Sequence, residues 1–329
     1  MIISRTPLRM SFVGGGSDMY EFYREHPGVV VSTAINKFIY VTVNKKFDSG
    51  IRVAYSKTEE VESVGQLDHK LVRAALNYLT LGGGVEITTV ADIPSRGTGL
   101  GSSSTFTVAL LHALQAFQGR HASAEDLASD ACHIEIDICG EPIGKQDQYA
   151  AAFGGFNTIE FFPDETVKVT PLVAQPTTLE TLESNLLMLY TGITRSASEL
   201  LQKQGEGIRD DRNKRQALTR MVDLCTDFRR ALEGGRPEDV GPILHENWLL
   251  KKSLATGVST SIIDAWYQAG LAAGATGGKI LGAGAGGFLL FYAPREHHAR
   301  ICHALPQLRP VPFKFERFGS QIIFFNPTR

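Results

Sequence analysis

The sequence predicts an α+β protein with two domains, and three observations support this fold class. The chain has 329 residues, of which 43% are hydrophobic, so it can form a large core. Its first part alternates short runs rich in Val, Ile, Phe and Tyr with turns, whereas its second part carries long helical patterns. The Pro- and Thr-containing segment 163–182 lies between them, so we expect domains at residues 1–183 and 184–329.

The elements of the first domain follow from residue type and spacing. Strands are expected at the β-branched and aromatic runs 10–13, 29–34, 38–43, 51–55 and 85–90. A helix is expected over residues 69–81, which carry an apolar face and are followed by three glycines. Residues 106–117 are apolar nearly all round, which predicts a buried helix. A further helix is expected at 124–138, with Leu127, Ala131, Ile134 and Ile138 facing inward.

The second domain is expected to be mostly helical around a few strands. Residues 186–190 and 288–292 are short apolar runs typical of buried strands, and 321–325 is expected to be the last strand. Between them, helical periodicity covers residues 196–231, 237–254 and 261–273.

Composition narrows the class of protein. The formal net charge is −2, which does not favour binding to nucleic acid or to an anionic membrane. No apolar run is long enough to span a bilayer, and the N-terminus lacks the features of a signal peptide, so we expect a cytoplasmic protein. The four cysteines form no C-x-x-C pair and are expected to be free thiols. The sequence does not decide between a monomer and a homodimer.

The serine-rich loop Pro94–Thr105 is the first candidate for chemistry. It reads PSRGTGLGSSST, follows a predicted strand and opens the buried helix. The free backbone N–H groups and the dipole at a helix start bind phosphate, and hydroxyl groups can bind phosphate or Mg²⁺. The alternative is a plain N-cap, for which serine is favoured, but three consecutive serines after glycines favour phosphate. No Gly-Lys-Ser/Thr sequence is present, which excludes a Walker A loop.

Acidic residues in the next segments are candidates for a general base or a metal ligand. Asp147 lies between two glutamines near glycines, so it is either a general base or an exposed aspartate at a helix start. Glu135 and Asp137 are two residues apart and therefore point to different faces of a helix. Glu135 shares the phase of the inward residues, whereas Asp137 is expected to be solvated.

Two glycine segments complete the candidates. Arg9 lies in an apolar strand, and the turn Gly14–Asp18 follows it, with sequence GGGSD. A carboxylate can accept two hydrogen bonds from neighbouring sugar hydroxyls, although Asp18 could also be a turn former in a glycine hairpin. The second segment, Gly282–Gly287, reads GAGAGG before an apolar strand and allows another group to approach the backbone closely.

These motifs together resemble the GHMP small-molecule kinases. The segments RTPLRMSFVGGGSD, GLGSSST, GKQDQYAAAFGG and KILGAGAGGF occur in the family's order and span most of the chain. The first and third are most similar to those of the D-glycero-α-D-manno-heptose 7-phosphate kinases. The resemblance implies an N-terminal ribosomal protein S5 domain 2-like domain and a ferredoxin-like C-terminal domain, with the active site between them. The serine loop is one residue longer than usual between Pro94 and Gly99, so no role is assigned to Ser95, Arg96 or Thr98.

The resemblance also implies roles for single residues. Mg²⁺, delivered with ATP as co-substrate, would be bound by Ser103 and Glu135. Asp147 would be the base, Arg9 would stabilise negative charge near the reacting hydroxyl, and Asp18 would bind a sugar hydroxyl. The serine loop would surround the triphosphate of ATP through Gly97, Gly99, Leu100, Gly101, Ser102, Ser103, Ser104 and Thr105. The two glycine segments would contact the substrate through Gly15, Gly16, Ser17, Gly284, Ala285 and Gly286.

The activity that this resemblance implies is transfer of the γ-phosphoryl group of ATP to the anomeric hydroxyl of a heptose 7-phosphate. The product would be D-glycero-D-manno-heptose 1,7-bisphosphate, as in the synthesis of nucleotide-activated heptose. Arg195 is the candidate for binding the sugar phosphate, unless it is an exposed arginine at a helix start. Two alternatives remain, namely a kinase for an unphosphorylated sugar related to galactose or fucose, and a non-catalytic sugar or ATP sensor.

Overall fold

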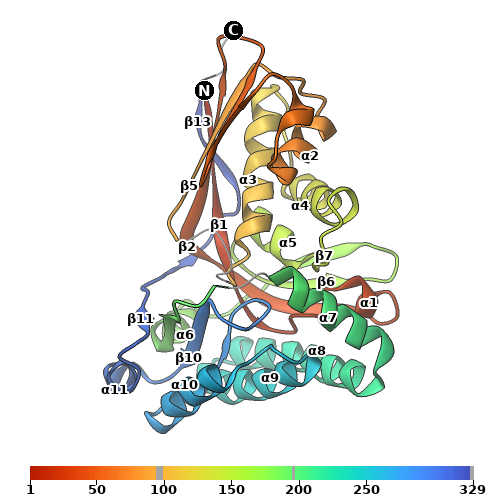
Figure 1. Cartoon of the computed structure of the whole chain (residues 1–329). Coiled ribbons are helices and arrows are strands. Elements are labelled where there is room, and N and C mark those ends of the chain that lie inside the picture. Colours follow the sequence, from red (N-terminus) through yellow and green to blue (C-terminus); the bar gives the residue numbers. More distant parts are fainter. Residues whose placement is uncertain (94–98, 195–196, 327–329) are drawn as a thin grey trace.

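The computed structural model describes residues 1–93, 99–194 and 197–326, and the chain forms an elongated molecule with a sheet-rich upper part and a helix-rich base (Figure 1). The strands are β1 (Ile2–Val13), β2 (Gly28–Lys45), β3 (Ile51–Ala54), β4 (Thr58–Val61), β5 (Val85–Ala91), β6 (Phe156–Phe161), β7 (Val167–Pro171), β8 (Leu186–Tyr190), β9 (Gly277–Ile280), β10 (Phe288–Tyr292), β11 (Arg309–Pro310), β12 (Phe315–Glu316) and β13 (Gln321–Phe325). The helices are α1 (Tyr20–Tyr23), α2 (Lys70–Tyr78), α3 (Ser102–Phe117), α4 (Ala124–Cys132), α5 (Gln146–Phe153), α6 (Pro176–Asn185), α7 (Ala197–Asp210), α8 (Arg212–Glu233), α9 (Val240–Leu254), α10 (Ser261–Ala272) and α11 (His298–Ala304).

Strand β2 is the central strand of the larger sheet. It pairs with β1 along most of its length, with β6 through its first half and with β5 through its second half. The two separate strands expected at 29–34 and 38–43 are therefore one strand with a bulge, where the pairing with β1 shifts between Pro7 and Leu8. Asn36 lies at this bulge and is held by both backbone groups of a distant residue, Lys314, which the local sequence cannot reveal.

Helix α3 is buried against this sheet, as predicted. Its residues Val108, Leu111 and Leu114 are all fully buried, and the helix contacts β1 and β2 on one side and α4 and α5 on the other. Figure 1 shows α2 and α4 outside α3, so that α3 is enclosed between the sheet and an outer helical layer. The helix is buried from Ser104 to Ala116 except at His112, and this burial holds its more exposed first turn in place.

The helix expected at 124–138 changes geometry before it ends. Residues Ala124–Cys132 are α-helical, but His133–Ile138 form a π-helical turn. Ile138 was expected to face inward, yet it is 48% exposed, because the wider π turn rotates the residues that follow it away from the apolar face. Glu135 stays fully buried, as its phase predicted.

The second part of the chain forms a smaller sheet covered by helices. The strands lie in the order β11-β8-β10-β9, all antiparallel, and β10 is buried at every residue. The single helix expected at 196–231 is two helices, because Asp211 leaves the helical conformation and accepts a hydrogen bond from Asn213 N at 2.8 Å as the N-cap of α8.

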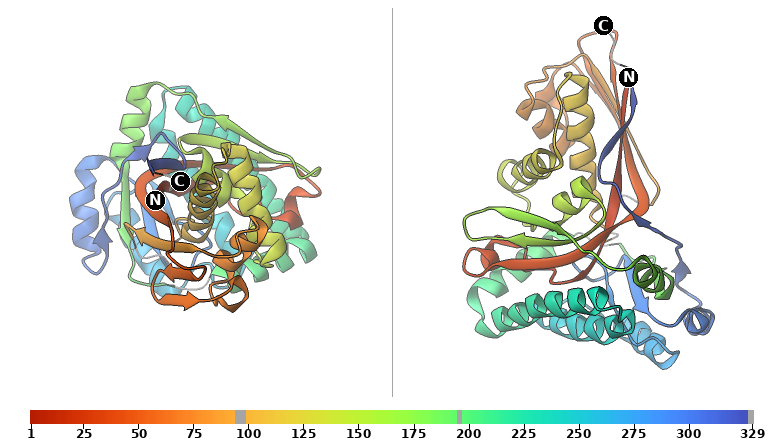
Figure 2. Two further views of the ribbon diagram at one scale, coloured as in Figure 1. Left: turned by 90° about the horizontal axis from the view of Figure 1, so that it is seen from above. Right: turned by 180° about the vertical axis from the view of Figure 1, so that it is seen from behind.

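The last strands return to the first sheet. Strand β13 was expected in the second domain, but it pairs antiparallel with β1, and β12 pairs with β2. Figure 2 shows this C-terminal strand running beside the N-terminal one. The proposed division at residue 183 therefore leaves residues 315–325 attached to the sheet of the other domain.

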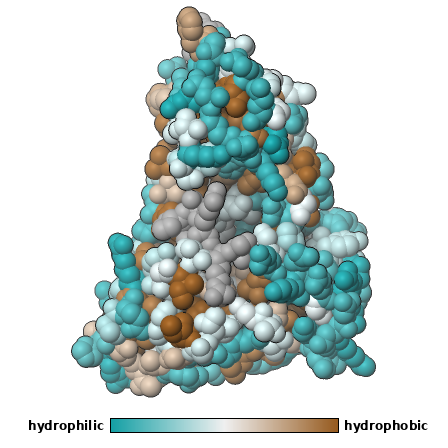
Figure 3. All heavy atoms as spheres, viewed as in Figure 1, coloured by the Kyte–Doolittle hydropathy of each residue, from teal (hydrophilic) through white to brown (hydrophobic). Residues whose placement is uncertain are grey.

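The surface viewed in Figure 3 is mostly hydrophilic, with hydrophobic residues in small separate groups. In the described ranges, no helix is both long and apolar enough to cross a membrane. The four cysteines are free, as expected.

Candidate active site

The serine loop lies where the two sheets meet. Gly101 has φ +75° and immediately precedes the first turn of α3. The N–H groups and the dipole at the start of a helix favour the binding of an anion. Gly99 has φ +77°, and a Cβ there would lie 2.2 Å from the carbonyl oxygen of Leu281, at the end of β9. Glycine is required at Gly99 by both its conformation and this close approach, which holds the loop against the second domain.

An ion pair lies directly beside this helix start. Both Arg9 Nε and Arg9 Nη2 lie 2.7 Å from Asp147 Oδ1, and Arg9 Nη1 donates to the Gly99 carbonyl oxygen, also at 2.7 Å. A Cβ on Gly101 would lie only 3.1 Å from Asp147 Oδ2. Asp147 is therefore not the exposed helix-start residue that the sequence left open, and its Oδ2 faces the serine loop.

The protonation of Asp147 reflects two opposing effects. Burial raises the pKa of this carboxyl group, while the charge of Arg9 acts to lower it. The net direction is upward, which makes the ionised carboxylate a better proton acceptor than a solvated aspartate.

Glu135 and the first turn of α3 form an oxygen-rich group on the other side of the loop. Ser103 donates to Glu135 Oε1 at 3.0 Å, and Gln148 Nε2 donates to Oε2 at 2.7 Å. Burial raises the pKa of Glu135 to about 7, even though hydrogen bonds from these neighbours favour its charged form.

These residues fit Mg²⁺, which prefers oxygen ligands and binds through one or two carboxylates together with phosphate oxygens. Within the described ranges, no group of three or more His, Cys, Asp or Glu residues could hold a metal by itself. A single carboxylate, Glu135, next to the Ser103 hydroxyl could hold Mg²⁺ only together with further oxygen ligands, such as the phosphates of a nucleotide.

The glycine turn is tied to the start of α5. Asp18 is 3% exposed, and its Oδ1 accepts from Gly16 N at 2.8 Å and from Gln146 Nε2 at 3.0 Å. A Cβ on Gly144 would lie 2.0 Å from Asp18 Oδ2, so the two segments are in close contact. Since Gln146 precedes Asp147, Asp18 fixes the position of the ion pair as well as lining the same cavity.

The chain encloses a cavity of about 600 Å³ at this place. The predicted residues that line it are Arg9, Gly15, Gly16, Asp18, Gly99, Gly101, Ser102, Ser103, Ser104, Glu135 and Asp147. Residues from four separate sequence segments thus converge on one site, as the motifs predicted.

Comparisons with known proteins agree with this geometry. The descriptions "GHMP kinases N terminal domain" and "GHMP kinases C terminal" match residues 69–155 and 228–309. The chain is 31% identical to D-glycero-alpha-D-manno-heptose 7-phosphate kinase of Campylobacter jejuni, over 92% of this chain and 93% of that protein.

The chain belongs to the GHMP kinases.

Two further proteins are similar to this chain over most of its length. A crystal structure of a D-glycero-D-manno-heptose 1-phosphate kinase from Bacteriodes thetaiotaomicron superposes with a TM-score of 0.81 at 27% identity, covering 99% of this chain and all of the other. A bifunctional fucokinase/GDP-fucose pyrophosphorylase of Arabidopsis thaliana is 28% identical over 89% of this chain, which corresponds to 30% of that longer protein. These relatives are kinases, and this GHMP kinase is an ATP-dependent phosphotransferase with an alcohol acceptor.

Some residues that the motifs indicated lie outside the cavity of this GHMP kinase. The hydroxyl of Ser17 donates to the carbonyl oxygens of Gly14 and Val29 and accepts from Val29 N, so it holds the turn together. Leu100 and Thr105 are fully buried behind the loop. Their expected contacts with ligands remain predictions, as do those of Gly97 and Arg195, which lie outside the described residues.

The middle of the second glycine segment also turns away from the cavity. Gly282 and Ala283 line it, but Gly284, Ala285 and Gly286 do not. Ala285 N donates to the Val258 carbonyl oxygen at 2.9 Å. The segment folds back on the loop before α10, so its glycines serve packing within the second domain, and a direct contact with substrate stays a prediction.

Two lysines of this kinase were missed by the sequence analysis. Lys251 of α9 and Lys279 of β9 line the cavity and are only 5% and 3% exposed. Lys251 lies three residues after Trp248 and three before Leu254, in the buried phase of its helix. This phase was the signal that distinguishes Lys251 from its neighbour Lys252, which is on the surface side and pairs with Asp264.

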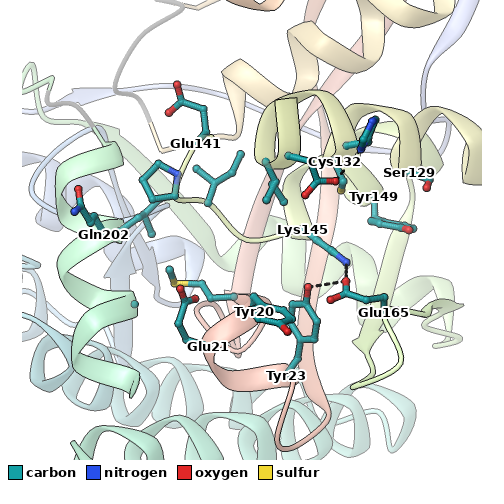
Figure 4. Close-up of a pocket in the computed structure, with 18 of the residues that line it drawn as sticks. Tyr20, Glu21, Tyr23, Ser129, Cys132, Glu141, Lys145, Tyr149, Glu165 and Gln202 are labelled. Carbon is teal, nitrogen blue, oxygen red and sulfur yellow. Dashed lines mark hydrogen bonds and ion pairs between the residues drawn. The ribbon is translucent and has the colours of Figure 1, made fainter. Parts of the chain in front are cut away.

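A larger cavity of about 1080 Å³ adjoins the site and shares Met19, Glu141, Ile143 and Leu201 with it. Figure 4 shows Tyr20, Tyr23 and Tyr149 around it, and the Lys145 ammonium hydrogen-bonded to Glu165. Its carboxylates outnumber its cations, which are already paired, so it is unsuited to a phosphate. The carboxylates are Glu21, Asp130, Asp137, Glu141, Glu165 and Glu206.

Proposed function

We propose that this GHMP kinase transfers the γ-phosphoryl group of ATP to the anomeric hydroxyl of D-glycero-D-manno-heptose 7-phosphate, giving the 1,7-bisphosphate. The observation that carries the proposal is the Arg9–Asp147 pair at the start of the phosphate-binding helix, inside one cavity with Asp18. The heptose phosphate kinase of Campylobacter jejuni, related over nearly its whole length, supports the choice of acceptor.

The binding steps follow from the charges and donors of the cavity. The β- and γ-phosphates of ATP would lie at the N–H groups of Gly101 and the serines that follow it, where the helix dipole favours negative charge. Mg²⁺ bound between Ser103, Glu135 and the phosphates would neutralise part of the charge that develops during transfer. Asp18 would accept a hydrogen bond from a ring hydroxyl and orient the sugar.

The chemical step would take place at Asp147. Its Oδ1 is held by Arg9, which leaves Oδ2 to accept a hydrogen bond from the acceptor hydroxyl. As the sugar oxygen forms its bond to the γ-phosphorus, the hydroxyl proton passes to Oδ2. The bond from the γ-phosphorus to its bridging oxygen breaks and ADP leaves. Arg9 would stabilise the charge on the transferring group.

The test is an ADP-release assay over matched acceptors with MgATP. The acceptors are heptose 7-phosphate, heptose 1-phosphate, free heptose, galactose and fucose. We expect the highest kcat/KM on heptose 7-phosphate. Phosphorylation of the anomeric hydroxyl removes the reducing end, so each ADP released should be accompanied by loss of one reducing sugar.

Each other result identifies an alternative. A higher kcat/KM on a free sugar would identify a kinase for an unphosphorylated acceptor, which the fucokinase relative makes the second candidate. Transfer to heptose 7-phosphate with the reducing end intact would move the reaction to another hydroxyl. Binding of both ligands without ADP release would identify a sensor.

A further inference from the structure

The ammonium groups of Lys251 and Lys279 are buried and line the active-site cavity, and neither forms an ion pair with a carboxylate of the described residues. Lys279 Nζ donates to the carbonyl oxygens of Ser11 and Phe12, both at 2.9 Å. Lys251 Nζ donates to the carbonyl oxygen of Gly15 at 2.9 Å and to Gln204 Oε1 at 3.4 Å. Neither lysine lies within 4 Å of a carboxylate in the part of the chain that the structure describes. Carbonyl oxygens satisfy their N–H groups only in part, since each ammonium has three donors.

Such an arrangement is costly in the free protein. A buried charge without a counter-ion is destabilising, and two like charges near each other add to that cost. Burial lowers the pKa of Lys251 to about 8 and that of Lys279 to about 7, and for Lys279 the charge of Lys251 acts in the same direction. A dianionic ligand would relieve both effects by supplying the missing counter-charge.

A third group points to the same ligand. Ser11 is 3% exposed and lines the cavity, and its hydroxyl has no hydrogen-bond partner in the described structure. A Cβ on Gly15 would lie 3.7 Å from this hydroxyl, so Ser11 and the residue that holds Lys251 are neighbours. The unpartnered Ser11 hydroxyl therefore lies near the groups that hold the two lysines. A hydroxyl donor at this place can hydrogen-bond to a phosphate oxygen, whereas a sugar carbon would leave it unsatisfied.

The position of Ser11 on β1 separates this group from the reacting hydroxyl. Arg9 and Ser11 are two residues apart on β1, so their side chains lie on the same face and about 7 Å apart. Arg9 is held at the Asp147 end and Ser11 at the lysine end. The length of a sugar with its exocyclic carbons fits between them, with the anomeric hydroxyl at one end and the phosphate at the other.

We propose that Lys251, Lys279 and the hydroxyl of Ser11 form the subsite for the phosphate that the acceptor sugar already carries. This inference rests on the proposed function, because it assigns one part of the acceptor to one part of the same cavity. It predicts selection of a phosphorylated sugar over the free sugar, since a neutral hydroxyl would leave both cations unpaired.

The test uses the full-length kinase with Lys251→Met, Lys279→Met and Ser11→Ala, and Lys252→Met as the matched control. Calorimetry measures the dissociation constants of heptose 7-phosphate and of MgADP. We expect each lysine variant to weaken the sugar phosphate by about 10- to 100-fold and MgADP by less than about 3-fold, because charge-assisted hydrogen bonds are the strong ones. Ser11→Ala should weaken the sugar phosphate by about 5-fold, and Lys252→Met should change neither ligand.

Several results would overturn the assignment. Equal weakening of MgADP and sugar phosphate would place the lysines at the ATP phosphates instead. Unchanged binding in all three variants, with a loss only in Arg195→Ala, would move the subsite to Arg195. The wild-type protein tests the proposed function separately. If the wild type neither binds nor phosphorylates heptose 7-phosphate, the proposed function fails, whatever the variants do.

Folding of the variants is checked by a measurement that does not depend on activity. Replacing a buried unpaired ammonium by Met, a chain of similar length, should raise the thermal midpoint. Inorganic phosphate should raise the midpoint of the wild type, and this stabilisation should be absent in Lys279→Met. Equal stabilisation of both proteins by inorganic phosphate would contradict the subsite.

Discussion

The two ends of the active-site cavity differ in how their buried charges are satisfied. At the Asp147 end, each charge has a protein partner: Arg9 holds Asp147, and Ser103 and Gln148 hold Glu135. At the lysine end, Lys279 donates to two backbone carbonyl oxygens, and Lys251 donates to one backbone carbonyl oxygen and to Gln204 Oε1. Neither lysine pairs with a carboxylate among the residues that the structure describes. The charges of the first end are paired within the protein, whereas those of the second lack a counter-ion. If the proposed function and subsite hold, the fold preorganises the catalytic groups, and specificity would reside where it leaves charge uncompensated.

The largest expected effect tests the preorganised end. Asp147→Asn keeps the shape of the side chain but removes the proton acceptor, so kcat should fall by about 10²- to 10⁴-fold. The affinity for MgADP should change by less than about 3-fold. The control is Asp137→Asn, since that side chain is 65% exposed and pairs with His133. A kcat close to that of the wild type in Asp147→Asn would mean that the carboxylate only orients the hydroxyl.

The next effect concerns the metal. Glu135→Gln removes the carboxylate charge while Ser103 and Gln148 keep hydrogen-bonding partners, so the Mg²⁺ concentration for half-maximal rate should rise by about 10- to 100-fold. The matched control is Glu59→Gln, because Glu59 is also buried and hydrogen-bonded, to Tyr55 and Asp68, but lies away from the cavity. An unchanged Mg²⁺ requirement in Glu135→Gln would exclude Glu135 as a metal ligand.

The pH dependence of binding tests the lysine end. The pKa values of Lys279 and Lys251 are lowered to about 7 and about 8, so these groups lose their charge as the pH rises from 7 to 9. The titratable neighbours are Asp18, Arg9 and Asp147 around Lys251, and Lys251, Arg9 and Cys225 around Lys279. Burial raises the pKa of the Cys225 thiol, so this group stays neutral over this pH range. The KM for the sugar phosphate should rise by about 10-fold per pH unit in the upper part of this range, and the KM for ATP should not follow it.

The lowered pKa values of the two lysines also determine whether the free energy of unfolding rises or falls with pH. Because the folded pKa of each lysine lies below its unfolded value of 10.5, the burial cost is fully present below pH 7. It is lost as the pH rises toward 10.5, so these two groups alone make the protein more stable at higher pH. Lys279→Met should reduce this slope, as measured by chemical unfolding between pH 6 and 9. An unchanged slope would contradict the lowered pKa.

The smallest expected effect comes from replacing Gly101 by Ala, compared with the same replacement at Gly119. The comparison separates the cost of backbone strain from the effect of a contact with the active site. Gly101 and Gly119 have φ values of +75° and +74°, but a Cβ on Gly119 would meet nothing within 4 Å. Substitution by Ala should therefore cost about 1 kcal/mol of stability at both positions. Only Gly101→Ala should also lower kcat, by about 10-fold, because its Cβ would press on Asp147. Equal kcat values in the two variants would show that the contact has no role.

Several parts of this structure could be predicted from local sequence alone. Helix α3 was predictable because its residues are apolar all round, and Glu135 because its phase matches that of buried neighbours. The fold class and the convergence of Arg9, Asp18 and Asp147 followed from the order of the motifs. Each of these features is encoded in residues close together in the chain or in a pattern shared with a family.

Other features depend on contacts between distant segments, so local patterns could not give them. The pairing of β13 with β1 joins residues more than 300 positions apart, and the bulge of β2 is held by Lys314. The second glycine segment has the composition of a ligand loop, yet Gly284–Gly286 pack on Val258 and Ile193. Glycine permits a close approach but does not say to which group.

The sequence by itself determined the kinase family, through a serine-headed buried helix, an aspartate and an arginine that match the motifs of that family. Only the tertiary structure decided that Arg9 and Asp147 form an ion pair and that Lys251 and Lys279 are buried in the same cavity without one. The physical reason is that a residue's type fixes its charge, whereas the free energy of that charge depends on burial and on partners that folding brings from elsewhere in the chain.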